Sequence, residues 1–310
     1  MTSSRDRKFR KKKKRAERIR KEKAAWRVKR RRDDPEPSDL GRAAPAPPPG
    51  MQFETERMFR RMRGLADPDS PSERAQELAF RAMDTDDSSE ALRLAEEALS
   101  LDADCVDALH VRALSSASGE ELLERLTQAV EAGERTLGKE CFTEHVGHFW
   151  GLVETRPYLR ARHSLGEVQW RLGHRTEAMA QYEEMLVLCP SDNLGVRDPL
   201  IGWLLAEGEL ARARRVLERF EDDALATMAW ARVAERVLAD DHEGALEALA
   251  TARERNPHAE RFLAGRAEIR GPAPEAYRLG SPEEAVAVAS ALTDISGPGS
   301  PFRAWLAARR

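Results

Sequence analysis

Three segments of the chain align without gaps and decide its fold: EALRLAEEALSLDAD at 90–104, EAMAQYEEMLVLCPS at 177–191, and GALEALATARERNPH at 244–258. Each carries a small residue near its start (Ala91, Ala178 and Ala245), and twelve residues later stands Ala103, Pro190 or Pro257. Small residues let two helices approach closely, and proline ends a helix where the next element must begin. The segments therefore predict the second helix of a repeated helix pair, followed by its turn.

This repeat resembles the tetratricopeptide repeat, a pair of antiparallel helices of about 34 residues. Clear units cover about 72–105, 159–192 and 226–259, and a weaker unit contains GELARARRVLERF, with Ala213 placed 35 residues after Ala178. Residues 106–150 are helical in pattern but depart from the consensus. We therefore expect an all-α fold, a tetratricopeptide-like right-handed helical solenoid over 53–310 with a capping segment at 260–310. In that segment Ser281, Pro282 and Glu284 predict a capped helix start.

The N-terminal part of the chain differs from the rest in charge. Residues 1–32 hold 18 Lys or Arg and three acidic residues, whereas the remainder holds 33 basic and 51 acidic residues. We expect 1–32 to be a disordered basic arm, because like charges four residues apart oppose an isolated helix. Residues 33–52 form a proline-rich linker. The charges that would bind a polyanion such as RNA or the ribosome include Lys11, Lys12, Lys13, Lys14, Arg15, Arg30, Arg31 and Arg32.

The composition of the chain narrows the class of protein. Hydrophobic residues make up 41% of the 310 residues, enough for a core, and aromatic residues only 6%. No apolar run approaches the length of a membrane span, and no apolar signal region follows the basic start, so we expect no membrane insertion and a cytoplasmic location. Cys105, Cys141 and Cys189 lie far apart, which predicts free thiols and fits that compartment.

The C-terminal stretch ARERNPHAERFLAGRAEIRGPAPEAYRLGSPEEAVAVA, at 252–289, resembles the suppressor of tumorigenicity seven family. The resemblance rests on Asn256, Pro257, His258, Pro272, Gly280, Glu284 and Ala285. Upstream, GHFWGLVETRPYLRAR at 147–162 looks similar to a segment of related bacterial tetratricopeptide proteins. The hydrophobic membrane segments of the animal members are missing here. The resemblance implies an interaction role and no particular reaction.

A polar stripe on one predicted helix, Pro157 to Leu172, is the leading candidate for a binding site. Its members recur at spacings of four, three, four and four: Arg156, Arg160, His163, Glu167 and Arg171. First helices of tetratricopeptide units line a groove, where Arg forks can bind the carboxylates of a peptide. The competing interpretation is an ordinary solvated face. The opposite stripe, which runs from Tyr158 to Leu172, is the expected core face.

Two further constellations compete with this stripe. Cys141, His145 and His148 would share one face if 140–152 is helical, and three such side chains could ligate zinc. Partly buried polar residues that pack an irregular segment are the plainer interpretation. Glu154 and Arg156 are expected to pair locally at the start of the following helix.

The sequence therefore predicts a protein-interaction scaffold that is not an enzyme and has no cofactor. Its expected partner is an unidentified protein or peptide, with a polyanion on the basic arm. The alternatives are a metal-dependent enzyme centred on Cys141, His145 and His148, and a nucleic-acid-binding protein.

Overall fold

The computed structural model describes residues 53–65, 67, 69–271, 274 and 276–309. The chain divides into two units, Met1–Ala44 and Pro45–Arg310, and all described residues belong to the second. The predicted basic arm at 1–32 and linker at 33–52 lie outside the described residues. Over the described ranges every regular element is helical and none is a strand, which confirms the all-α class.

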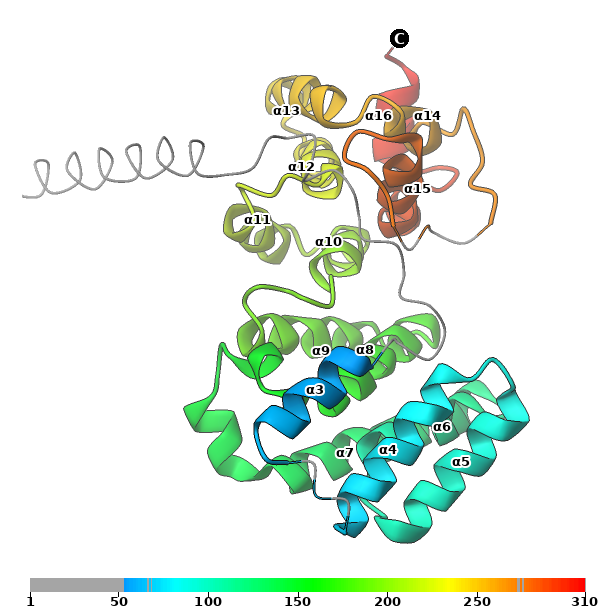
Figure 1. The fold of residues 1–310 in the computed structure, drawn as a ribbon. Helices are drawn as coiled ribbons and strands as arrows, with labels where there is room; N and C mark the ends of the chain where they lie inside the picture. The colour runs from blue at the N-terminus through cyan, green and yellow to red at the C-terminus, as the bar shows by residue number, and fades with distance from the viewer. Residues whose placement is uncertain (1–52, 66, 68, 272–273, 275, 310) are drawn as a thin grey trace, which may run out of the picture. The chain divides into compact units, whose positions relative to one another are not determined.

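The first half of the described chain holds a short leading helix, three long helix pairs and two 3-10 turns (Figure 1). Its elements are α3 (Glu54–Met62), α4 (Pro71–Asp84), α5 (Ser88–Leu101), α6 (Val106–Leu114), α7 (Gly119–Glu144), η1 (Phe149–Gly151), η2 (Val153–Thr155), α8 (Arg156–Arg171) and α9 (Arg175–Leu188).

The second half continues with two more helix pairs and a C-terminal group of short helices. Its elements are α10 (Arg197–Ala206), α11 (Leu210–Arg219), α12 (Ala226–Leu238), α13 (His242–Arg255), α14 (Ala259–Leu263), α15 (Pro282–Ala291), η3 (Thr293–Ile295) and α16 (Pro301–Ala307).

The three aligned segments form α5, α9 and α13, and each packs against the helix before it, as predicted. Ala178 of α9 and Ala245 of α13 are fully buried, as is Ala213 of α11, whereas Ala91 of α5 is partly buried. Between α8 and α9 the approach is closest at Gly166, where a Cβ atom would lie 2.6 Å from the Tyr182 ring. A small residue is therefore required there, because the two helices leave no room for a methyl group.

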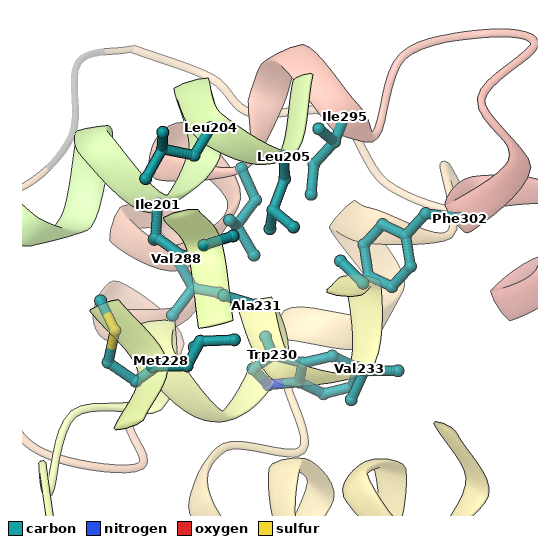
Figure 2. Close-up of a cluster of buried hydrophobic side chains, with 14 of the residues drawn as sticks. Ile201, Leu204, Leu205, Met228, Trp230, Ala231, Val233, Val288, Ile295 and Phe302 are labelled. Atoms are coloured by element: carbon teal, nitrogen blue, oxygen red, sulfur yellow. The ribbon is translucent and has the colours of Figure 1, made fainter. Parts of the chain in front are cut away.

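The core consists of three clusters of buried apolar side chains, one for each of the regions α4–α6, α6–α9 and α8–α16. Figure 2 shows part of the third, where Ile201 and Leu204 of α10 and Trp230 of α12 lie beside Val288 of α15 and Phe302 of α16. The C-terminal helices thus share the core of the preceding repeats.

The C-terminal helices lie directly on the first helices of the last two pairs, because α15, η3 and α16 contact α10 and α12. A Cβ atom at Gly202 of α10 would lie 2.0 Å from the carbonyl oxygen of Ala291, so only glycine permits this approach. Trp170 Nε1 of α8 donates to Asp294 Oδ2 over 2.9 Å. The predicted capping segment therefore covers one face of α10 and α12.

The start of α15 confirms the predicted capped helix, since Ser281 Oγ accepts the backbone N–H of Glu284. Glu284 is 1% exposed and accepts from the side chain of Asn256 and the backbone N–H groups of Ala226 and Gly280. Asn256 and Glu284, two residues of the family resemblance, thus join three segments of chain in a buried hydrogen-bonded clasp.

None of the helices in the described ranges combines the length and the apolar character needed to cross a lipid bilayer.

Candidate functional site

The helix that carries the predicted polar stripe, α8, begins at Arg156 and ends at Arg171. Tyr158, Ala161, Leu165 and Val168 are at most 3% exposed, as expected for its core face. Leu172 was expected in the same core stripe but follows the helix end and is 39% exposed. The core face of α8 therefore ends with Val168 and Trp170, which are buried, and does not include Leu172.

Arg160 lies at the centre of a charged node that joins four helices. Its Nε and Nη2 atoms donate to the two carboxylate oxygens of Asp107 on α6, over 2.9 and 2.6 Å. Its Nη1 and Nη2 atoms donate to the carboxylate of Glu56 on α3, over 3.0 and 3.1 Å. Gln76 of α4 donates to Asp107 over 2.7 Å. Four of the five N–H donors of the guanidinium are therefore taken by internal partners.

Burial of this node makes its charges interdependent. Asp107 is 0% exposed and Glu56 is 5% exposed. Burial tends to raise the pKa of Asp107, but the adjacent Arg160 guanidinium and the hydrogen bond from Gln76 hold it below its usual range. Burial likewise opposes the charge of Arg160, and Asp107 and Glu56 overcome it and raise the pKa of Arg160. Asp107 and Arg160 are therefore both charged at neutral pH.

Helix α3 is attached to this face mainly by ion pairs. Arg57 contacts Glu77 and Asp84 of α4 over 3.1 and 3.4 Å. Arg60 pairs with Glu73, and Arg63 with Glu154 over 3.0 Å. Its apolar anchor is Phe53, which stacks on Phe80 with ring centroids 5.0 Å apart. The outer side of α3 leaves Met58, Phe59 and Met62 between 37% and 73% exposed.

The expectation that Arg156 and Arg160 present free forks to a peptide is wrong for these two residues. Arg156 lies 3.7 Å from Glu56 and over the rings of Trp150 and Phe59, while Arg160 is held as described above. Glu56 of α3, in the same chain, occupies the position in which a carboxylate of a bound peptide was expected. The expected local pair of Glu154 with Arg156 does not form either, because each contacts α3, through Arg63 and Glu56 respectively.

The remaining stripe residues have two different environments. His163 stacks on Tyr182 with centroids 5.4 Å apart, and burial lowers the pKa of His163. Glu167 and Arg171 are exposed. The five residues of the stripe therefore do not form a single surface, and solvent reaches mainly the two near the end of the helix.

Cys141, His145 and His148 do not lie on one helix. The chain kinks at Gly138, where φ is +70°, α7 ends at Glu144, and His145 is its C-cap. His148 precedes η1 in a separate turn. No three His, Cys, Asp or Glu side chains in the described part of the chain gather as metal ligands would. The one-face arrangement behind the zinc alternative is therefore absent.

An open groove lies beside the Arg160 node, between the α4–α5 corner and α6, with a volume of about 710 Å³. Apolar side chains from α4, α5 and α6, including Met83, Leu92 and Leu114, line it together with hydroxyls and His110. Arg160 is the one charged residue among the described residues of its lining. Two other hollows, of about 620 and 590 Å³, are lined mostly by charged side chains of α3, α4 and α5. Of these three, the first groove has the fewest charged residues in its described lining.

A second group of buried charges lies at the start of α10. Arg197 donates to Asp192 and Asp223 over 2.8 and 2.7 Å. Asp198 accepts from Thr227 over 3.4 Å, while its Oδ1 atom has no hydrogen-bond partner among the described residues. Burial raises the pKa of Asp198 to about 7, Asp223 and Asp192 add to the rise, and Arg197 opposes it.

Sequence reasoning missed both the node and the groove. A single Asp in the apolar run VDALHVRAL, at 106–114, was the available signal for Asp107, since a buried charge requires a partner. Leu114 closes the same run, in the segment that departs from the repeat consensus. The charged residues of the arm, from Lys11 to Arg32, lie outside the described residues. Compared with known proteins, the chain matches no protein-family model and no curated sequence.

Proposed function

We propose that the protein is an interaction scaffold of tetratricopeptide-like helix pairs, stacked as a right-handed solenoid, which holds a protein or peptide partner and catalyses no reaction. Two sets of contacts support the stacked arrangement. Within pairs, α4 packs on α5, α8 on α9 and α12 on α13. Between pairs, first helices contact first helices, α4 with α6, α6 with α8, and α10 with α12, as stacking of repeats requires.

The observation that carries the proposal is the apolar groove between the α4–α5 corner and α6. Its volume of about 710 Å³ lies within the range of roughly 300–1,000 Å³ of ligand sites. Arg160, the one charged residue of its described lining, already donates hydrogen bonds to Asp107 and Glu56. Such a lining favours binding by burial of apolar side chains.

The basic arm has a separate role in this proposal. Residues 1–32 attach the scaffold to a polyanion such as RNA or the ribosome in the cytoplasm, and the repeats hold the specific protein. The support is the charge division of the chain, with 18 Lys or Arg in the arm. Attraction of that kind gains affinity by counterion release and carries little sequence preference.

Affinity capture from extract, with and without nuclease, tests the division of roles. The full chain and a chain lacking residues 1–50 are compared as baits. We expect the truncated bait to keep a protein partner after nuclease treatment and to lose nucleic acid. If nuclease or truncation removes every captured protein, the scaffold proposal fails and the nucleic-acid-binding alternative takes its place.

A further inference from the structure

The groove beside α6 has an exposed apolar wall that the fold does not need. Leu114, the last residue of α6, is 60% exposed although Val111 and Ala113 beside it are buried. Met83 and Leu92 face the same groove from α4 and α5. Burying a Leu side chain of a partner between such walls removes apolar surface from water on both molecules.

The groove contains no cation that is free to bind a carboxylate. Arg160 makes four hydrogen bonds to Asp107 and Glu56, so two carboxylates surround one guanidinium. An acidic side chain brought to Arg160 would meet these two charges and be repelled. The chemistry expected from the Arg stripe, recognition of an acidic peptide, is therefore not the chemistry of this groove.

Exposed carboxylates lie next to the groove. Asp86 and Asp87 are exposed and lie in the chain between the lining residues Thr85 and Ser88. Glu120 is exposed in the first turn of α7, four residues after the lining residue Ser116. Two exposed cations also stand next to lining residues in the chain, Arg81 beside Ala82 and Arg93 beside Leu92, and Glu90 attracts both. Arg93 pairs with Glu90 and Glu97 over 2.7 and 3.0 Å. The charge around the groove therefore complements a cationic ligand.

Two lining residues also carry buried polar atoms that have no hydrogen-bond partner in the described part of the chain, Nδ1 of His110 and Oγ of Ser116. The other ring nitrogen of His110 contacts Ser164 Oγ over 2.8 Å. A buried polar atom without a hydrogen bond is unfavourable, and a small side-chain rotation toward an entering peptide amide or carbonyl would satisfy it. These two atoms favour a ligand whose peptide backbone can form hydrogen bonds over a purely apolar ligand.

We propose that this groove binds an extended segment of a protein partner in which an apolar side chain stands next to Lys or Arg. The apolar side chain packs against Leu114, Met83 and Leu92, and the cation lies toward Asp86. This inference rests on the proposed scaffold function and specifies the partner of its site.

A random peptide library displayed on phage, selected on the immobilised full chain, tests the chemistry without knowledge of the natural partner. We expect enriched peptides to combine Leu, Met or Phe with an adjacent Lys or Arg and to be poor in Asp and Glu. Enrichment of acidic peptides would overturn the inference. Failure to enrich any peptide above the bare support would count against both the groove and the scaffold.

Matched variants then locate the binding site, with an enriched synthetic peptide as the probe in fluorescence anisotropy. Leu114→Gln should raise the Kd roughly tenfold or more, because one apolar contact is lost. Leu246→Gln, at a leucine 53% exposed on α13, is the control and should leave the Kd unchanged. Asp86→Lys should weaken binding several-fold and reduce its dependence on salt. Equal affinities for the Leu114 and Leu246 variants would overturn the groove inference and leave the scaffold proposal standing.

Discussion

At the scale of single residues, the environment of Arg160 reverses what its helical spacing indicates. A charged residue on the polar face of an amphipathic helix is usually solvated, and its ion pairs contribute little. Arg160 instead neutralises Asp107, which is 0% exposed and has Gln76 as its other side-chain partner. Its partner Glu56 lies 104 residues away in sequence. No local sequence pattern indicates a contact between residues so far apart in the sequence.

Arg160→Ala should destabilise the fold by about 3–5 kcal/mol, because it leaves the carboxylate of Asp107 buried without its counter-charge. Arg171→Ala, at an exposed position on the same helix, should change the free energy of unfolding by no more than about 0.5 kcal/mol. Urea denaturation of both variants measures the difference. Equal and small effects would mean that the node contributes no net stability.

Asp198 gives the fold a dependence on pH near neutrality. Its folded pKa of about 7 lies above the usual aspartate value of 3.8, so the folded protein favours the protonated form more than the unfolded chain does. The groups facing it are Arg197, Asp192, Asp223, Thr227 and Tyr277. Its contribution to stability is fully present below about pH 4 and is lost as pH rises through about 7.

Asp198→Asn should therefore remove part of the decline in stability between about pH 4 and pH 7, which for one such group approaches about 1.4 kcal/mol per pH unit. Melting temperatures between about pH 4 and pH 8 measure this slope, with Asp240→Asn, at a side chain 94% exposed, as the control. A slope that is the same for wild type and Asp198→Asn would contradict the assignment.

At the scale of elements, the sequence predicts where most helices form but not which elements pack against one another. The repeated segments became α5, α9 and α13, and Ser281, Pro282 and Glu284 form the capped start of α15, because caps and helical spacing act within a few residues. A continuous helix through 140–152 does not form, since α7 ends at Glu144 and Gly147 has a φ of +87°. Positive φ at glycine depends on the turn that surrounds it.

Helix α3 shows the same limit more strongly. The helix spans Glu54–Met62. Its position over α8 depends on ion pairs with residues 13 to 104 positions away. The helical spacing of polar residues carries no information on ion pairs between distant segments. From the sequence alone, a peptide-binding face on α8 therefore looks the same as a face that another helix of the chain covers.

Glu56→Ala should loosen α3, because it removes the two bonds to Arg160 and each charge-assisted bond contributes about 1.5–3 kcal/mol. Amide hydrogen exchange over 54–62 should become at least roughly tenfold faster, while exchange in α12 stays unchanged. Glu54→Ala on the same helix is the control, since its side chain is 51% exposed and its ion pair with Arg57 lies within α3. If both variants exchange alike, α3 is not held through Glu56.

At the scale of the whole molecule, the division of charge predicts a salt-dependent attachment. Residues 1–32 carry 18 basic and three acidic residues, and the rest of the chain is acidic. The full chain should bind an RNA duplex of about 20 base pairs with an affinity that falls steeply as salt rises. Removal of 1–32 should abolish this binding and leave the helical circular dichroism of the body unchanged. Binding that survives truncation, or that ignores salt, would contradict the electrostatic account.

The node at Asp107 also determines how the first three helix pairs come apart. In an array whose units touch only their neighbours, unfolding can start at either end and spread one unit at a time. Here Gln76 of the first pair and Arg160 of the third meet on one carboxylate of the second. Opening any one pair leaves a buried charge short of partners in the others. The three pairs are therefore expected to melt as a single cooperative block, with little fraying of the terminal pair.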